Sequence, residues 1–245
     1  MSGLGDVVRM EIHDGGVVEV ILAQPARLNV VDLATRDGLI EAFTAIRDLP
    51  DARALLLRAE GKHFSAGADL KEFGSAETIF EARRIRWDRD PWYLLWSLNL
   101  PKVAALHGYA LGSGLEMSMM CDFRIAAANT MVGLPETKLG MLPAAGGTRS
   151  ITSWLRPPAA LPLVLSGDPI DAAEALRLGL VHTVLGPDED VDSEARHLAR
   201  RLAELPPAAA AAAVAAVKAS MDLPLSQGLQ EEERLSYLTR RFNSA

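Results

Sequence analysis

The chain has 245 residues, with 25 basic and 32 acidic side chains and a formal net charge of −7. This length is enough for one large domain with a well-buried core, and the composition excludes a disordered chain. The net negative charge disfavours general binding to nucleic acid or to anionic membranes. Cys121 is the single cysteine, the first residues lack the apolar segment of a secretion signal, and no apolar run is long enough to span a membrane, so we expect a cytoplasmic protein.

Strands and helices alternate along the first three quarters of the chain, which predicts an α/β architecture. A β-branched run at 17–22 predicts a strand, apolar residues with helical spacing predict a helix over 33–49, and the apolar run at 54–57 predicts a strand buried on both faces. Further strands are predicted at 102–110, 123–127 and 180–185, and further helices at 76–98, 114–121, 147–155 and 171–178.

The pattern changes after Pro187, where three helical segments follow one another at 190–205, 208–221 and 226–241 with no strand between them. We therefore expect an α/β core over residues 1–187 and a C-terminal helical region over residues 188–245.

A first cluster of small residues, at 61–73, joins a predicted strand to a predicted helix. Asp69 and Glu72 have the spacing of a helix N-cap and its reciprocal partner. That arrangement leaves the amide groups of residues 66–68 near a helix start, where N–H groups can face a ligand oxygen. Taken alone, the cluster is more typical of an ordinary strand-to-helix turn.

A second cluster, at 108–116, repeats this design and places Glu116 in the first turn of a helix. A third cluster presents Glu136 directly after Pro135, and Gly146-Gly147 opens another helix. Simpler interpretations exist for both acids. Glu116 can compensate a helix dipole, and Glu136 can pair with Lys138.

Together the clusters predict a site that combines oxyanion binding with acid–base chemistry. Two turns with free N–H groups can bind one carbonyl oxygen between them and stabilise an enolate as negative charge develops. Two glutamates can then each handle one proton, provided that burial or a neighbouring charge keeps the acidic one protonated near neutral pH.

Four motifs, in order, resemble the crotonase superfamily and specifically the enoyl-CoA hydratases. They are Gln24-Pro25-Ala26-Arg27-Leu28-Asn29, Ala66-Gly67-Ala68-Asp69-Leu70, Gly112-Ser113-Gly114-Leu115-Glu116, and Pro135-Glu136 followed by Pro143-Ala144-Ala145-Gly146-Gly147-Thr148. The resemblance, which covers about residues 10–240, implies a spiral of β-β-α units, a C-terminal trimerisation region, and homotrimers that often pair into homohexamers.

The resemblance also assigns roles by position. The amides of Ala68 and Ser113 would form an oxyanion hole for an acyl-CoA thioester, and Glu116 and Glu136 would hold and activate the added water. The Glu136 position exchanges the proton at the α-carbon and the Glu116 position assists attack at the β-carbon. Residues implied to line the coenzyme A and substrate groove are Arg27, Leu28, Ala66, Asp69, Leu70, Gly112, Pro135 and Ala144.

The implied reaction is addition of water to a trans-2-enoyl-CoA, as in fatty acid β-oxidation, with coenzyme A as part of the substrate and with no metal or other cofactor. Three features depart from the family pattern: Ser113 and Ala144 stand where glycine is commoner, and the terminal segment with a Glu-Gly pair is not found before Ala245. The alternatives are another reaction of this fold (isomerase, decarboxylase or thioesterase) and a non-catalytic acyl-CoA-binding subunit.

Other reactive side chains have simpler interpretations. Neither His63 nor His107 has metal-ligand spacing, and Cys121 has no evident base, so we expect structural roles for all three. The aromatic residues Trp87, Trp92, Tyr93 and Trp96 can line an acyl pocket but are more typical of packing, and the interleaved Arg83, Arg84, Arg86 and Arg89 are more typical of a solvated helix face.

Overall fold

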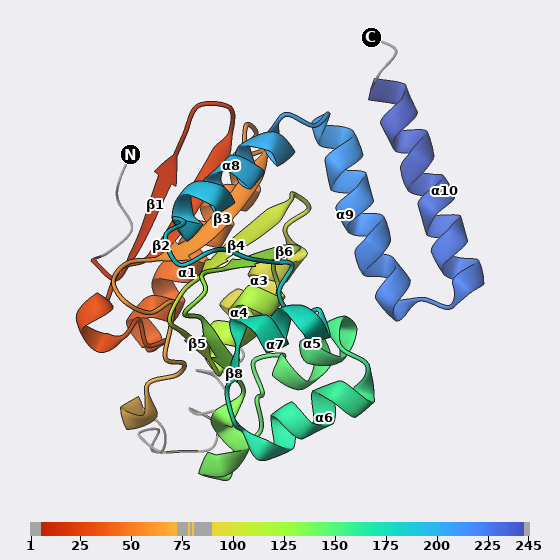
Figure 1. The fold of residues 1–245 in the computed structure, drawn as a ribbon. Helices are drawn as coiled ribbons and strands as arrows, with labels where there is room; N and C mark the ends of the chain where they lie inside the picture. Colours follow the sequence, from red (N-terminus) through yellow and green to blue (C-terminus); the bar gives the residue numbers. More distant parts are fainter. Residues whose placement is uncertain (1–5, 73–77, 79, 81–89, 243–245) are drawn as a thin grey trace.

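The computed structural model describes residues 6–72, 78, 80 and 90–242, and its strands lie in two sheets (Figure 1). In the larger sheet β1 is antiparallel to β2, and every later neighbour is parallel. Its order is β1 (Val8–Ile12), β2 (Val17–Leu22), β3 (Ala54–Ala59), β4 (Lys102–Leu106), β6 (Phe123–Ala126) and β9 (Thr183–Val184). The smaller sheet has the order β5 (Tyr109–Leu111), β7 (Met131–Gly133) and β8 (Ile170–Asp171).

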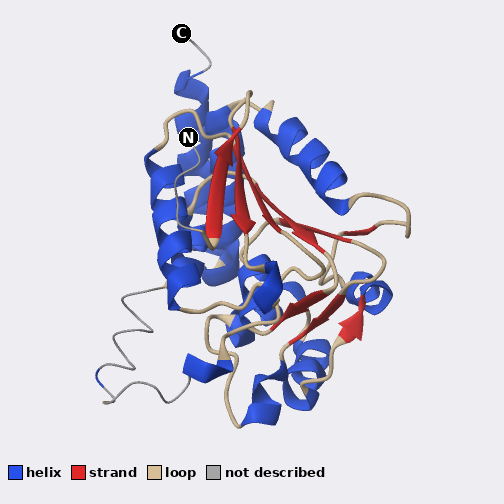
Figure 2. Ribbon diagram, turned by 90° about the vertical axis from the view of Figure 1, so that its left-hand side faces the viewer, coloured by secondary structure: helices blue, strands red, loops and turns tan. Residues whose placement is uncertain are grey.

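Helices cover both faces of the larger sheet, as the nearly edge-on view in Figure 2 shows. Helix α1 (Leu33–Asp48) contacts β1 and β2, and α8 (Val191–Ala203) contacts β3 and β4 on the opposite face. Strand side chains alternate between the two faces, so Leu55 and Leu57 join one hydrophobic core while Leu56 joins the other. The parallel strands are therefore buried on both faces.

The remaining helices lie between the strands along the chain or follow the last strand. Helices α9 and α10 form an antiparallel pair that stands beside the rest of the molecule (Figure 1). None of the described helices is by itself long and apolar enough to cross a lipid bilayer. The bounds of these remaining helices are η1 (Pro25–Arg27), η2 (Leu70–Glu72), α3 (Pro91–Ser97), α4 (Ser113–Met119), η3 (Pro135–Leu139), α5 (Gly147–Trp154), α6 (Pro157–Ser166), α7 (Ala172–Leu178), α9 (Pro207–Asp222) and α10 (Leu225–Phe242).

The predicted mixed α/β architecture with a helical C-terminal region is confirmed. Two boundaries differ from the expectation. The segment 102–110 forms two strands, β4 and β5, and the described part of the helix predicted over 76–98 is the shorter α3. The helical region predicted from residue 188 begins with α8, which packs on the sheet, so only α9 and α10 stand apart from the core.

A buried carboxylate ties α8 to the sheet. Glu19, on β2, has no exposed surface and accepts hydrogen bonds from Arg196 of α8 at 2.5 Å and from Arg58 of β3 at 2.6 Å. Burial opposes ionisation of this carboxyl, but the hydrogen bonds and charges of Arg196 and Arg58 outweigh it, and the pKa of Glu19 falls to about 2.

Candidate active site

Two backbone turns meet at the end of β5. Residue Ser65 bridges Ala110 in parallel fashion, so the segment that contains Ser65 and the strand β5 run side by side and turn at the same place. Gly67, with φ of 97°, and Gly112, with φ of 49°, make these turns. A Cβ atom at Gly67 would lie 3.0 Å from the carbonyl oxygen of Leu111, and a Cβ atom at Gly112 would lie 3.8 Å from the Cα of Gly67. The two turns therefore face each other, backbone against backbone.

Each turn offers one amide without a partner. Around the first turn, the amides of Ala66, Gly67 and Asp69 donate to acceptors in the chain, whereas the Ala68 amide has no acceptor among the described residues. In the second turn, Ser113 is the first residue of α4, so its amide has no intrahelical acceptor and finds none elsewhere in the described part of the chain. The fold thus places one free N–H group in each of the two facing turns.

Helix α4 carries the first carboxyl group. All seven residues of this helix are buried, and Glu116 is 1% exposed. Its Oε1 atom accepts hydrogen bonds from the amides of Ala145 and Gly147, both at 2.9 Å. A Cβ atom at Gly147 would lie 2.6 Å from this oxygen, so glycine is needed where α5 begins. Two N–H donors on one oxygen suit a carboxylate, which can only accept hydrogen bonds.

The second carboxyl group belongs to Glu136, in the short helix η3 that begins at Pro135. Its Oε2 atom is buried and has no hydrogen-bond partner among the described residues. Its Oε1 atom lies against Gly112, where an added Cβ would approach to 2.6 Å. Burial raises the pKa of Glu136, and the alternative pairing with Lys138 is not formed because Lys138 pairs with Asp168. Glu136 is therefore suited to holding a proton.

The residues predicted to line the coenzyme A groove lie around the same two turns. Arg27 pairs with Asp32 and Asp69, each at 2.5 Å, and the amide of Ala66 donates to the carbonyl of Leu28 at 3.0 Å. Leu28 and Leu70 are 44% and 55% exposed, so both side chains are accessible from solvent. On the other side of the turns, Gly112 and Pro135 flank Glu136, and Ala144 lies in the loop that holds Glu116.

The predicted reciprocal cap between Asp69 and Glu72 is wrong. Asp69 does accept a hydrogen bond two residues on, from the amide of Lys71 at 3.0 Å. The Glu72 carboxylate instead accepts from the amide of Leu33, the first residue of α1, at 3.1 Å. The Glu72 carboxylate thus binds the start of α1, which is distant in sequence, and does not cap its own helix.

Two residues, Asn29 and Trp92, support the turns through hydrogen bonds that the sequence did not predict. Asn29 is 2% exposed, and its side-chain amide donates to the backbone carbonyls of Glu60 and His63 at 2.8 Å each. The backbone carbonyl of Asn29 accepts a hydrogen bond from the Ser65 hydroxyl at 2.7 Å. The indole of Trp92 donates to the carbonyl of Ser113 at 3.2 Å. The φ of Asn29 is 50°, and asparagine adopts positive φ more readily than most residues, so an asparagine at the end of the Gln24–Asn29 motif is the sequence signal for this turn.

The other reactive residues have structural surroundings. His63 accepts a hydrogen bond from the amide of Tyr109 at 3.1 Å and stacks on its ring, and burial lowers the pKa of His107, which favours the neutral imidazole. Cys121 is buried, and burial raises the pKa of its thiol to about 12. The aromatic and arginine residues named above at positions 83, 84, 86, 87 and 89 lie outside the described residues.

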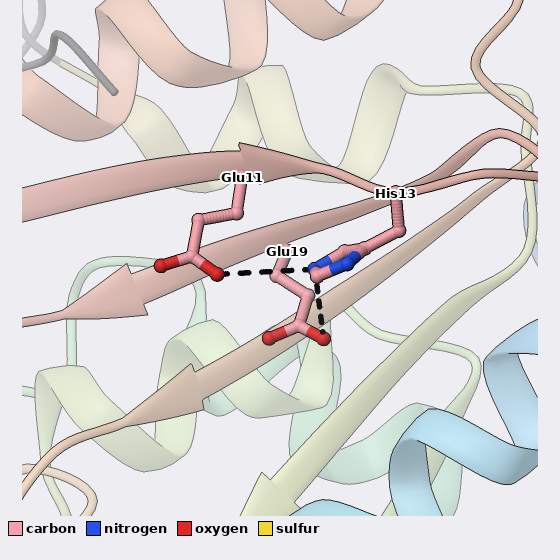
Figure 3. A group of neighbouring side chains, drawn as sticks. All are labelled: Glu11, His13 and Glu19. Carbon is pink, nitrogen blue, oxygen red and sulfur yellow. Dashed lines mark ion pairs between the residues drawn. The ribbon is translucent and has the colours of Figure 1, made fainter. Parts of the chain in front are cut away.

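One group of acidic and imidazole side chains in the described part of the chain is compact enough to ligate a metal ion. It consists of Glu11, His13 and Glu19, on the β1–β2 hairpin (Figure 3). The Nε2 atom of His13 lies 3.2 Å from Glu19 and 3.9 Å from Glu11. Because Glu19 is already bound by two guanidinium groups, a cation at this position would compete with two positive charges.

Residues 13–244 match the family model described as enoyl-CoA hydratase/isomerase. The chain belongs to the enoyl-CoA hydratase/isomerase family. A family relative, a probable enoyl-CoA hydratase of Mycobacterium tuberculosis, is 38% identical over 223 residues, which are 91% of this chain and 86% of the relative. A carnitinyl-CoA dehydratase of Salmonella arizonae is 36% identical over 88% of this chain and 82% of its own length.

Solved structures of the same family share the fold. The crystal structure of an enoyl-CoA hydratase from Bacillus anthracis matches with a TM-score of 0.88 and 31% identity, over 94% of this chain and 90% of that structure. The predicted family and its fold are therefore confirmed, while the role of each site residue stays a prediction.

Proposed function

We propose that this protein is an enoyl-CoA hydratase, which adds water across the double bond of a trans-2-enoyl-CoA and gives a 3-hydroxyacyl-CoA. The observation that carries the proposal is the meeting, at the start of α4, of two unpartnered amides with two carboxyl groups in different environments. The relatives named as hydratases support it.

The amides of Ala68 and Ser113 bind the thioester oxygen in this mechanism. As the double bond is attacked, negative charge moves onto that oxygen, and two N–H groups fixed in place stabilise it. The donors cost no reorganisation at that moment because both turns are held by backbone contacts.

The two glutamates divide the proton transfers. Glu116, whose oxygen accepts two N–H groups, acts as the base that takes a proton from the water attacking the β-carbon. Glu136, whose burial favours the protonated form, delivers a proton to the α-carbon. After the addition Glu116 is protonated and Glu136 is ionised, so the transfer of one proton from Glu116 to Glu136, through solvent water, restores the starting state.

Hydration is redox-neutral, and all acid, base and oxyanion-binding groups in this mechanism come from the chain. We therefore propose that coenzyme A, as part of the substrate, is the only group the reaction needs. We also propose a homotrimer or homohexamer, a cytoplasmic location and a role in fatty acid breakdown, which the family resemblance supports.

The test follows the loss of the conjugated thioester absorbance with a four-carbon enoyl-CoA. Wild type is expected to turn over, and Glu116→Gln and Glu136→Gln are each expected to lower kcat about 10²–10⁴-fold, as loss of a general acid or base does. Lys138→Gln, next to Glu136 on the exposed side of η3, is the matched control and is expected to keep the wild-type rate.

Other outcomes separate the alternatives. Full activity of Glu116→Gln together with loss in Glu136→Gln would favour a one-base isomerase. Tight acyl-CoA binding by wild type with no turnover of any substrate would favour a binding subunit.

A further inference from the structure

Ser65 contacts both turns of the candidate active site. The residue is fully buried. Its amide donates to the carbonyl of Tyr109 at 2.8 Å, and its carbonyl accepts from the amide of Leu111 at 3.0 Å. These two hydrogen bonds join the first turn to β5, the strand that leads into the second turn. The main chain of Ser65 is thus used by strand pairing, and its hydroxyl is left for other contacts.

The hydroxyl group of Ser65 bonds to two backbone groups. It donates to the carbonyl of Asn29 at 2.7 Å and accepts from the amide of Gly67 at 3.2 Å. A hydroxyl has one proton, so its donation to Asn29 leaves the lone pairs of Oγ for the Gly67 amide. Gly67 has no side chain to restrict its backbone, so this hydrogen bond is what holds the peptide that precedes Gly67.

The peptide that follows Gly67 is held from another segment. The carbonyl of Gly67 accepts from the amide of Val31 at 2.8 Å. This peptide is trans and planar, so its N–H, which belongs to Ala68, points away from Val31. The Ser65 hydroxyl holds one peptide of Gly67 and Val31 holds the other, and together they set the direction of the Ala68 amide.

The second turn packs against the same serine side chain. Gly114 directly follows Ser113, and an added Cβ atom at Gly114 would lie 2.6 Å from the Cβ and 2.9 Å from the Oγ of Ser65. Glycine at this position therefore leaves room for Ser65, and the main chain of Gly114 limits where the hydroxyl can lie.

A buried serine can also serve the fold alone, and Ser118 is such a case. It is as fully buried as Ser65, and its hydroxyl donates to the carbonyl of Leu115 at 2.9 Å, within α4. The hydrogen bonds of Ser65, by contrast, hold the turn that carries one of the two unpartnered amides.

We propose that Ser65 is a positioning residue whose hydroxyl aims the Ala68 amide at the oxygen that the Ser113 amide also binds. The proposal rests on the proposed function for the identity of that oxygen, which is the thioester carbonyl. An oxyanion hole stabilises charge only when its donors are fixed in the right direction. Loss of the hydroxyl therefore weakens the stabilisation of the enolate, while the contacts to the rest of the substrate stay as they are.

The first measurement compares the kinetics of Ser65→Ala with those of wild type. We expect kcat to fall about 10–10²-fold, as a small misplacement of a catalytic group does, and KM to stay within about threefold. Ser118→Ala removes an equally buried hydroxyl and is expected to keep both values. Equal losses in the two variants, or no loss in Ser65→Ala, would overturn the proposal.

The second measurement is the infrared stretching frequency of the thioester carbonyl in bound butyryl-CoA, labelled with a heavy carbon isotope at that atom. This saturated thioester is not hydrated, so the reading does not depend on turnover. Hydrogen bonds to a carbonyl oxygen lower its stretching frequency. Wild type and Ser118→Ala are expected to lower it below the value in water, and Ser65→Ala is expected to return it towards that value. A fall in kcat with an unchanged band would show that Ser65 serves the fold alone and would overturn the proposal.

Gly114→Ala tests the contact from the second turn, and it keeps the Ser65 hydroxyl. Alanine is favoured over glycine within a helix, so the new Cβ acts through its clash with Ser65. We expect kcat to fall and the carbonyl band to move towards its value in water, as in Ser65→Ala. Gly38→Ala, in α1, is the matched control, because its Cβ would also meet a side chain, 3.0 Å from the Cβ of Val8, and it is expected to leave the band unchanged. An unchanged band in Gly114→Ala would contradict the proposal.

The two proposals fail in different ways. A wild-type protein that lowers the carbonyl frequency but hydrates no enoyl-CoA would contradict the hydratase assignment, and the infrared band would still decide the role of Ser65. A wild-type protein that hydrates its substrate, with the same band in Ser65→Ala, would contradict the role of Ser65 alone. A wild-type band at the value in water would contradict both.

Discussion

At the scale of single residues, Glu136 links the proposed chemistry to the pH dependence of stability. Burial raises the pKa of this carboxyl above its ordinary value of 4.5. Between pH 4.5 and the raised pKa, the folded protein therefore holds a proton that the unfolded chain has lost. As a result, the free energy of unfolding falls as pH rises from 4.5 through the raised pKa.

Glu136→Gln removes this penalty because the amide never ionises. We expect the variant to melt at a higher temperature than wild type at pH 8, with about 2–4 °C for each 1 kcal/mol regained, and to show no gain at pH 4. Thermal unfolding at both pH values checks this. A variant that is destabilised at pH 8 would show that Glu136 has a partner that stabilises its ionised form.

The two amides of the oxyanion hole are backbone groups, and Ser113 offers a way to remove one of them. Ser113 is the first residue of α4, a position where proline is tolerated because its missing N–H has no helical acceptor. Ser113→Pro is expected to lower kcat about 10²–10³-fold with circular dichroism unchanged. Ser113→Ala keeps the amide and is expected to keep the rate within a few-fold. If the alanine variant were equally impaired, the hydroxyl and not the amide would be the group that matters.

At the scale of elements, the Glu19 cluster decides how firmly α8 is held. The ion pairs of Glu19 stabilise the fold fully above pH 4.5, and this contribution is lost as pH falls from there towards its pKa of about 2. Glu19→Gln leaves Arg58 and Arg196 without their shared carboxylate and is expected to cost about 3 kcal/mol at pH 7.

Urea denaturation at pH 7 and pH 3 measures that cost, which is expected to shrink at the lower pH. Glu11→Gln is the matched control on the same hairpin. Its side chain is 41% exposed and lies 3.9 Å from His13, so a change of less than about 0.5 kcal/mol is expected. Equal effects of the two substitutions would mean that burial of Glu19 does not set its contribution.

Elements with a strong repeating pattern were predictable from the sequence. The strand predicted at 17–22 and the helix predicted over 33–49 agree with β2 and α1 within one residue. Helix α6 was missed because Pro157, Pro158 and Pro162 fall within ten residues, although the first two occupy the first turn, where proline is tolerated. The break between β4 and β5 was also missed, because apolar residues continue across Gly108, whose φ of 54° turns the chain.

The site was predictable where it depends on local sequence. Pro135 before Glu136, and Gly146-Gly147 at the start of α5, form the turns that their residue types indicate. Contacts between distant segments were not predictable. Neither the hydrogen bond from Leu33 to Glu72 nor the clamp of Glu116 by the Ala145 and Gly147 amides follows from spacing, because the fold alone brings these segments together.

At the scale of the whole molecule, α10 presents an apolar surface beside the rest of the fold. Leu225 is 81% exposed, Leu229 56% and Tyr237 62%, which is typical of an interface between subunits. This agrees with the homotrimer that the family resemblance implies. Light scattering after size exclusion is expected to give three or six times the chain mass for wild type and a smaller mass for Leu229→Asp. Gln230→Asp, which adds the same charge at the next position, is expected to leave the mass unchanged, and a monomeric wild type would contradict the prediction.

The contact between the turns at Gly67 and Gly112 has a consequence for how such a protein diverges. The separation of the two N–H groups is set by main chain resting on main chain, with no rotamers that a neighbouring substitution can disturb. Side chains elsewhere in the molecule can therefore change over many generations while the spacing of these two N–H groups is inherited intact.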